Sequence, residues 1–401
     1  MKTRLTYANC VVAAGCLALS VSPLLADPGF STNAVYAKSN LVSDISGLAP
    51  RTDARLVNPW GLLGAPDGTW VANGGSGLVA GYGSQGTKTS FAIRVRTPAG
   101  DQGKPSGLVF NDSRQFVITN GSKHAAATFL IATENGTIAG WNHSISGSNS
   151  VIVVDRSGSE AIYKGLTILR DTNGAPHIYA ANFHGNSVDV FDGTFNYVSS
   201  FTDTTLPANF APFNCAKIHG KLFVSFALQK LPDAEDDQAG PGNGYVDIFD
   251  TDGTLLRQFA SQGVLNSPWA MVEAPNQFGK FGNALLIGNF GDGTINAFDL
   301  ISGKSLGALS DASGNPIVID GLWGLAFNRQ RSNGRWDFSA ERLYFTAGIN
   351  GEADGLLGYI KSVGRQIKKN GKDSFGQGQG GGQWGGQGND QGGGQGNGQR
   401  R

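Results

Sequence analysis

Residues 58–86, NPWGLLGAPDGTWVANGGSGLVAGYGSQG, decide the fold. They predict three short strands, WGLLGA, TWVAN and LVAGY, joined by a Pro-Asp-Gly turn and a Gly-rich turn. The glycines of these turns supply the positive φ angles that tight antiparallel connections need. A meander this small cannot bury both of its faces, so neighbouring copies must cover it.

The same pattern recurs along the chain. Further copies begin at KPSGLVFN (104–111), YKGLTILR (163–170), FNCAKIHG (213–220), SPWAMVEA (267–274) and DGLWGLAF (320–327). In the second copy, FVITNG (116–121) is predicted as the second strand and TIAGWN (137–142) as the third. Equivalent positions lie roughly 46 to 58 residues apart, a spacing typical of propeller blades: Gly61, Gly107, Gly165, Asn214, Ala270 and Gly324. We therefore predict an all-β, six-bladed β-propeller around a central channel.

The two ends of the domain are expected to meet in the sixth blade. That blade shows only three strands before the pattern stops near Lys361, whereas residues 34–42 (AVYAKSNLV) form an isolated strand before the first repeat. We predict that this N-terminal strand pairs with residues 356–361 and closes the ring, which removes an exposed sheet edge. The propeller domain is then 27–365. Residues 366–401 are rich in Gly and Gln and predict a disordered tail.

Residues 1–26 have the pattern of a signal peptide, with Lys2 and Arg4 before a largely apolar stretch. Two cleavage sites are open: after Ala26, or before Cys16, where VAAGC resembles a lipoprotein box and would give a lipid anchor. Both predict an exported protein that is periplasmic, on the cell surface or extracellular. Removal of residues 1–26 leaves Cys215 as the only cysteine, which we interpret as a buried, inert thiol.

Composition excludes some partners. Lys and Arg together number 31, equal to Asp and Glu together, whereas nucleic-acid-binding proteins usually have a basic excess. After residue 26 no stretch reaches the ~20 apolar residues of a membrane span. We therefore expect that the protein does not bind nucleic acid and that it has no membrane-spanning segment after residue 26.

Polar and aromatic residues are predicted to gather at one mouth of the channel. Strand alternation places the start of each first strand on the same face as the loop between strands two and three. The candidate residues of this face are Asn58, Trp60, Asn73, Asn120, Asn182, His184, Trp269, Asn289 and Trp323. Amide oxygens are ligands for Ca²⁺, so Asn73, Asn120, Asn182 and Asn289 are metal candidates. The alternative is that these amides only cap their own turns.

An acidic insertion, LPDAEDDQAGPGNG (231–244), is predicted between strands two and three of the fourth blade. It reads either as a solvated loop or as a lid that adds carboxylates to a cation at the mouth: Asp233, Glu235, Asp236 and Asp237. A lactonase-like, metal-dependent reaction would also need carboxylates near this face. The candidates are Glu273, Asp292, Asp320 and Asp354.

The blade pattern resembles that of NHL-type and gluconolactonase-type propellers. LVNPWGL (56–62), GPGNGYVDIFDTDG (240–253), NSPWA (266–270) and LLIGNFGDGTINAFD (285–299) resemble more closely a family of exported bacterial propellers with no assigned reaction. That family's Pro-Glu-Pro sorting signal is absent from this sequence. The resemblance implies the fold and no activity.

Two functions remain open. The first is an exported, non-catalytic propeller that binds a protein or glycan through one face of the ring. The alternative is a metal-dependent hydrolase or lyase, lactonase-like, acting at the channel mouth. An enzyme needs convergent acid and base groups that the sequence does not display, so the binding function is favoured.

Overall fold

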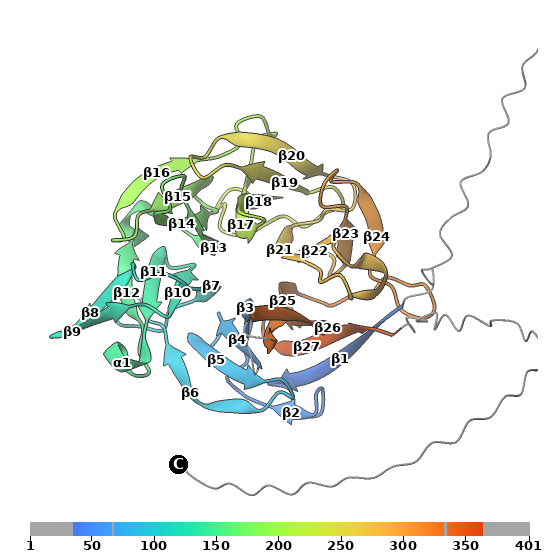
Figure 1. The fold of residues 1–401 in the computed structure, drawn as a ribbon, viewed down its shortest axis with the longest axis horizontal. Helices are drawn as coiled ribbons and strands as arrows, with labels where there is room; N and C mark the ends of the chain where they lie inside the picture. The colour runs from blue at the N-terminus through green and yellow to red at the C-terminus, as the bar shows by residue number, and fades with distance from the viewer. Residues whose placement is uncertain (1–34, 66–67, 333–334, 364–401) are drawn as a thin grey trace, which may run out of the picture. The chain divides into compact units, whose positions relative to one another are not determined.

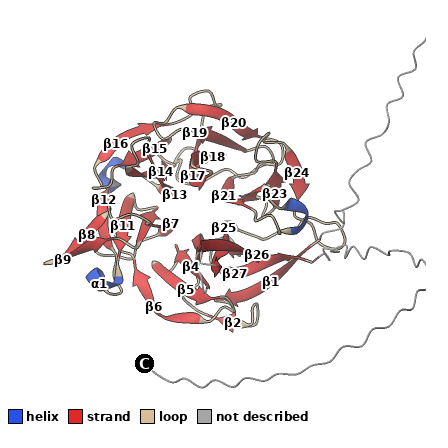
Figure 2. Cartoon of the chain, in the orientation of Figure 1, coloured by secondary structure: helices blue, strands red, loops and turns tan. Residues whose placement is uncertain are grey.

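The computed structural model describes residues 35–65, 68–332 and 335–363. The regular structure in these residues is almost entirely β-strand (Figure 2), with one short helix, α1 (His143–Ser146), and two 3-10 turns, η1 (Ser157–Ser159) and η2 (Gly279–Phe281). Six sheets surround an axis (Figure 1), which confirms the six-bladed propeller. None of the helices in the described residues is long and apolar enough to span a membrane. The predicted signal peptide and the predicted tail both lie outside the described residues.

Five blades are four-stranded antiparallel sheets numbered outward from the axis. Blade 1 contains β3 (Pro59–Ala65), β4 (Gly68–Asn73), β5 (Leu78–Gly83) and β6 (Lys88–Arg94). Blade 2 contains β7 (Pro105–Phe110), β10 (Phe129–Thr133), β11 (Thr137–Trp141) and β12 (Val151–Asp155). Blade 3 contains β13 (Tyr163–Arg170), β14 (Pro176–Asn182), β15 (Ser187–Phe191) and β16 (Tyr197–Phe201).

The last blades follow the same plan. Blade 4 contains β17 (Phe210–Ile218), β18 (Lys221–Leu228), β19 (Gly244–Phe249) and β20 (Leu255–Ser261). Blade 5 contains β21 (Pro268–Glu273), β22 (Leu285–Asn289), β23 (Ile295–Phe298) and β24 (Ser305–Ala308). Blade 6 contains β25 (Leu322–Ser332), β26 (Arg335–Ala347), β27 (Leu356–Ser362) and two strands from the start of the chain, β1 (Tyr36–Ser43) and β2 (Arg51–Thr52).

The N-terminal strand closes the ring as predicted. β1 pairs antiparallel with β27 in a register that runs from Tyr36 opposite Ser362 to Ser43 opposite Leu356. The Tyr36 hydroxyl also donates to the carbonyl of Phe278 (3.0 Å) and accepts from the amide of Phe281 (3.2 Å), both in blade 5. One strand therefore joins the chain's beginning to its last two blades.

The prediction for blade 2 was wrong in its second strand. FVITNG does not enter the blade: it forms β8 (Val117–Asn120), which pairs only with β9 (Lys123–Ala126) in a separate hairpin. Its Asn-Gly pair does make a hairpin turn, with Gly121 at φ 61°. The hairpin is an insertion between strands one and two of the blade, and Asn120 is exposed on it, outside the blade's sheet.

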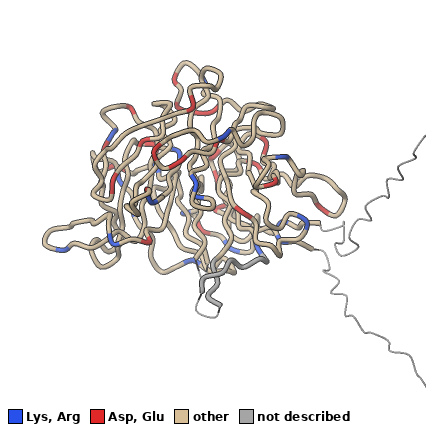
Figure 3. The backbone as a smooth tube through the Cα atoms, turned by 45° about the horizontal axis from the view of Figure 1, so that its top comes forward, with Lys and Arg blue, Asp and Glu red and all other residues tan. Residues whose placement is uncertain are grey.

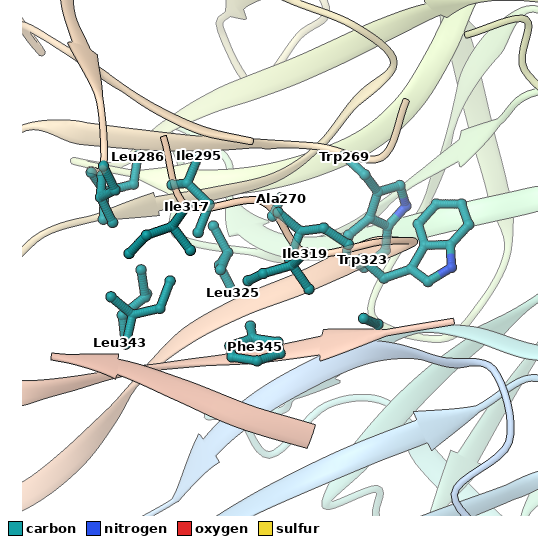
Figure 4. Packing of buried hydrophobic residues seen from close by; sticks show 14 of the residues in the cluster. Trp269, Ala270, Leu286, Ile295, Ile317, Ile319, Trp323, Leu325, Leu343 and Phe345 are labelled. Atoms are coloured by element: carbon teal, nitrogen blue, oxygen red, sulfur yellow. The ribbon is translucent and has the colours of Figure 1, made fainter. Parts of the chain in front are cut away.

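The hydrophobic core consists of apolar layers between neighbouring blades. Figure 4 shows part of the layer between blades 5 and 6, where Leu286 and Ile295 pack near Leu325 and Phe345. Every side chain labelled in Figure 4 is buried. Similar layers fill the junctions between the other blades. Because each blade buries both of its faces against neighbours, stability depends on the closed ring.

Glycine at the inner strands lets these blades approach closely. A Cβ at Gly61 would lie 2.6 Å from the carbonyl oxygen of Ser106 in the next blade, and one at Gly165 would collide with the side-chain oxygen of Asn214. The matched positions of the repeats are therefore where adjacent inner strands contact one another.

Candidate functional site

One ring of equivalent residues closes a mouth of the channel. Each lies directly before a matched position of the repeat, on the innermost strand of its blade, and each is at most 5% exposed: Trp60, Ser106, Lys164, Phe213, Trp269 and Trp323. The Ser106 hydroxyl donates to the carbonyl of Tyr163 in the next blade. The other members of the ring contact one another. We call these six residues the plug.

Aromatic stacking holds the centre of the plug. The Trp323 indole lies between the ring of Trp60, at a centroid distance of 3.5 Å, and that of Phe290, at 3.9 Å. Trp269 packs edge-on against Trp323, with centroids 5.8 Å apart. Figure 4 shows Trp269 and Trp323 at the end of the apolar layer between blades 5 and 6. Aromatic pairs of this kind contribute about 0.5–1.5 kcal/mol each beyond their buried area.

The axial cavity beside the plug is small, about 110 Å³. It is lined by the inner strands, including Gly61, Gly107, Cys215 and Gly324. Burial raises the pKa of the Cys215 thiol well above its usual range, so this cysteine is protonated and unreactive at neutral pH.

The plug contains one charged residue, Lys164. Its Nζ lies 2.5 Å from Glu134 Oε1 and 3.4 Å from Asp236 Oδ1, and it stands over the rings of Trp60 (5.1 Å) and Phe183 (5.9 Å). Burial alone would lower the pKa of Lys164, but the charge and hydrogen bond of Glu134, together with the charges of Asp236 and Asp237, raise it overall, so the ammonium stays charged.

Glu352, in the loop between β26 and β27, lies close to the same group of charges. Asn58 Nδ2 donates to Glu352 Oε2 (3.2 Å), and Asn58 Oδ1 accepts from Trp60 Nε1 (2.9 Å). Burial, and then the negative charge of Glu134, raises the pKa of Glu352 to about 7. Asn58 adopts φ 45°, a left-handed conformation that Asn tolerates, directly before the strand that carries Trp60.

The acidic insertion lies where it was predicted, between β18 and β19. Its backbone is tied down by bonds from Lys230 N to Asp236 O (2.8 Å) and from Gln238 N to Leu228 O (2.7 Å). Asp236 reaches Lys164, and Asp237 is half-buried with its pKa raised by burial. Asp233 and Glu235 are exposed. The cation under this loop is thus a lysine of the protein itself.

The predicted asparagine ring does not converge on the axis. Asn73 Nδ2 donates to the carbonyls of Val71 and Leu78, and Asn289 Nδ2 donates to the carbonyl of Val264. Asn182 Oδ1 accepts from the amides of Ile162 and Gly185. The bonds of Asn73 close its own turn, whereas Asn182 also bonds Ile162, directly before β13, and Asn289 bonds Val264, between blades 4 and 5. Asn120 lies away from the mouth on the β8–β9 hairpin.

The remaining sequence candidates are dispersed. His184 is half-buried, with Nε2 3.9 Å from a Glu160 carboxylate oxygen. Asp292 accepts from Thr294, and Asp320 and Asp354 each accept from Asn350. Glu273 pairs with His219 (2.9 Å) in the β17–β18 turn, on the opposite face. Across the described residues no three His, Cys, Asp or Glu side chains form a group that could hold a metal ion.

Sequence reasoning missed Glu134, Lys164 and Glu352. A signal for Lys164 was present, because it directly precedes Gly165 just as Trp60 precedes Gly61. Glu134 was hidden by the inserted hairpin, which displaced the second strand of blade 2. Glu352 lies in the loop between β26 and β27, residues 348–355, whose path the repeat does not predict.

The likeness to solved structures concerns overall shape. The chain has a TM-score of 0.46 with a streptogramin B lyase at 11% identity, covering 82% of this chain and 98% of that one. It has a TM-score of 0.49 with a protein of unknown function from Bacteroides thetaiotaomicron at 10% identity, covering 82% and 76%.

Sequence relatives come from a virus. No model of a protein family matches the chain. It is 34% identical over 328 residues to uncharacterized protein R648 of Acanthamoeba polyphaga mimivirus, covering 80% of this chain and 78% of that protein. It is 33% identical over 339 residues to uncharacterized protein L690 of the same virus, covering 82% and 86%. The bacterial origin expected for the family is therefore unsupported, and the chain belongs to the same protein family as these two mimivirus proteins.

Proposed function

We propose that the protein is a non-catalytic binding propeller whose mouth face takes a positively charged segment of a partner protein. The observation that carries this proposal is the single buried cation of the plug, Lys164, which is outnumbered by the carboxylates around it: Glu134, Asp236, Asp237 and Glu352. The surplus of negative charge is open to a second cation brought by a partner.

The loops around the mouth extend this charge. In every blade the loop between strands two and three opens on the mouth face, because strands alternate in direction. Among the described residues these loops contain one Lys or Arg, Lys230, against a series of acidic residues: Glu134, Asp233, Glu235, Asp236, Asp237, Asp292, Glu352 and Asp354. Figure 3 shows where Asp and Glu lie along the backbone. A chain with no net charge thus has an acidic centre on one face.

The plug favours binding over catalysis. Its aromatic side chains are at most 5% exposed and fill the mouth, so a partner meets the loops and not an open reaction chamber. A catalytic centre needs reacting groups that a substrate can reach. Burying a lysine is costly unless its partners are held in place, and loops of blades 2 and 4 hold them here.

Glu352 makes the proposal measurable. A bound cation stabilises the ionised carboxylate, so binding near neutral pH releases part of a proton, and affinity rises as the pH rises through about 7. A neutral glycan would release none. The number of protons released on binding therefore distinguishes a cationic ligand from a neutral glycan.

Isothermal titration calorimetry of the full chain with a hexalysine peptide tests the proposal, with the Nε-acetylated peptide as control. Two buffers of different ionisation enthalpy give the proton count. Asp233→Asn with Glu235→Gln should weaken binding by about two- to thirtyfold, because each exposed charge pair contributes about 0.2–1 kcal/mol. Asp252→Asn on the opposite face should have no effect. Equal binding of the acetylated peptide, or binding insensitive to the loop variant, overturns the proposal.

One observation favours a second function, acid–base catalysis at the mouth. A carboxylic acid whose pKa is about 7 can take and return a proton at neutral pH, and Glu352 is such a group beside a charged lysine. Hydrolysis assays with simple lactones and esters would show a rate that depends on an ionisation near pH 7 and disappears in Glu352→Gln. Equal rates in both proteins exclude this role for Glu352.

A further inference from the structure

A second group of acidic residues lies away from the mouth, between blades 3 and 4. Asp247 is on β19 and is 0% exposed. It lies two residues from Tyr245 and two from Phe249, so it points into the same apolar layer as they do, which also contains Val188 and Val190 of blade 3. Its neighbours across the sheet are Val224 and Gln258.

The other member is Asp203, in the segment between blades 3 and 4 and 6% exposed. Asp203 Oδ1 accepts from the amide and the hydroxyl of Thr205, both at 2.7 Å. Its Oδ2 and both carboxyl oxygens of Asp247 have no hydrogen-bond partner among the described residues. Three buried carboxyl oxygens are thus without a donor in the part of the chain that the structure describes.

Comparison with other buried aspartates shows that this is unusual for the fold. Asp189 is on the third strand of blade 3, as Asp247 is in blade 4, and it accepts from Tyr163, Asn182 and Ser187. Asp53, at the junction of blades 6 and 1, pairs with Arg55 (2.8 Å). No Lys or Arg forms an ion pair with Asp203 or Asp247 in the described part of the chain.

The Asp203 and Asp247 carboxyl groups lie within hydrogen-bonding reach of one another. Two such buried carboxylates cannot both be ionised without a cation, so one proton must remain with the pair. Burial, and then the charge of Asp203, raises the pKa of Asp247 to about 8. The other titratable groups of this layer are Cys215, Tyr179 and Tyr245, none of which can carry a positive charge.

We propose that Asp203 and Asp247 form a proton-dependent joint that holds blades 3 and 4 together and sets the position of the acidic loop at the mouth. The loop, residues 231–244, is connected to both members of the pair. It ends at Gly244, where β19 begins, and at its other end the Gln229 amide donates to the Asn209 carbonyl (2.8 Å), in the segment that carries Asp203. Loss of the shared proton loosens this junction and frees the loop.

The sign of the effect follows from the raised pKa. The protonated carboxyl is favoured in the folded protein, so its stabilisation is complete below the unfolded value near 4 and is lost as the pH rises through about 8. Over that range the unfolding equilibrium constant should increase by up to about tenfold per pH unit. Above pH 8 the dependence levels off.

Chemical denaturation of the full chain at pH 5, 6, 7, 8 and 9 tests the joint, alongside hydrogen exchange of residues 229–247 at the same pH values. Wild type should lose stability towards pH 8, and exchange of the loop should rise with it. Asp247→Asn keeps a neutral side chain and should remove the slope between pH 7 and 8, whereas below pH 7 the raised pKa of Glu352 retains part of it.

Asp203→Asn should do the same and serves if the first variant does not fold. Asp189→Asn, at the matched position of blade 3, should leave the pH slope unchanged. A wild-type stability that does not change between pH 7 and 8, or a slope in that range retained in both Asp203→Asn and Asp247→Asn, overturns the proposal. Faster hydrogen exchange of the loop at high pH, with no change in the free energy of unfolding, would show that the loop moves independently of the Asp203–Asp247 pair and would also overturn the proposal.

Discussion

Trp60 and Trp323 lie on the innermost strands of the first and the last blade, and their indole rings stack with centroids 3.5 Å apart. In the outer part of blade 6, the sheet that contains Trp323, β1 pairs with β27. The ring is therefore closed twice, by side chains at the axis and by backbone hydrogen bonds further out. Loss of either closure should therefore destabilise the whole domain.

Truncation of Trp323 should destabilise the ring strongly. Trp323→Ala removes a buried aromatic side chain with partners on both faces, and we expect the free energy of unfolding to fall by about 3–5 kcal/mol in urea denaturation. Trp323→Phe should lower the free energy of unfolding much less, because Trp323 Nε1 has no hydrogen-bond partner among the described residues. Trp269→Phe is the matched comparison, since Trp269 Nε1 donates to the Lys164 carbonyl (3.1 Å). If the two Phe variants lower the free energy of unfolding equally, the hydrogen bond of the Trp269 indole N–H contributes nothing to stability.

Removal of the plug's cation should leave its carboxylates uncompensated. Lys164→Met should lower the free energy of unfolding by about 3–5 kcal/mol, the usual range when one partner of a buried ion pair is removed. The double variant Lys164→Met, Glu134→Gln should recover part of that loss, since it removes the nearest stranded charge. Urea denaturation of the single and double variants gives the coupling energy. Additive effects would show that the two side chains do not interact.

The inner strands should not tolerate a side chain at Gly165. Gly165→Ala places a methyl group against the Asn214 side chain, and we expect a loss of about 1–3 kcal/mol, measured by thermal or urea denaturation. Gly158→Ala is the matched control, because a Cβ there meets nothing within 4 Å. Similar stabilities for the two variants would contradict the close approach of blades 3 and 4.

Much of the fold could be predicted from sequence because it depends on local signals that repeat. Turn glycines and short apolar runs recur in each blade, and the isolated strand before the first repeat had one free sheet edge to join. The error at Asn120 has the same origin: an Asn-Gly turn marks a hairpin but not the sheet to which it belongs.

The candidate site was less predictable because it depends on contacts between blades. The repeat predicted that Trp60, Trp269 and Trp323 lie at one end of the channel, and their rings contact one another in the structure. The pairing of Lys164 with Glu134, by contrast, joins residues 30 positions apart in different blades. The asparagines were chosen for their chemistry as ligands, and their short side chains bond turns of their own or the adjoining blade instead. Residue type alone does not decide between these uses.

Removal of residues 27–45 should open the ring. The deletion takes away β1, its pairing with β27 and the Tyr36 contacts with Phe278 and Phe281, so we expect a clear fall in melting temperature. Tyr36→Phe removes only the hydroxyl and should cost about 1–2 kcal/mol. Differential scanning calorimetry distinguishes the two. An unchanged melting temperature after the deletion would mean that β27 needs no partner.

The pairing of Tyr36 with Ser362 has a consequence for biosynthesis. A ribosome makes β1 first, yet β1 cannot find its partner until β27 has left the exit tunnel, after nearly all the other blades have been synthesised. During that interval the nascent chain has an unpaired strand at one end and an incomplete sheet at the other. The time between the first and the last strand, rather than the strength of any single contact, then sets how long the chain depends on protection from aggregation.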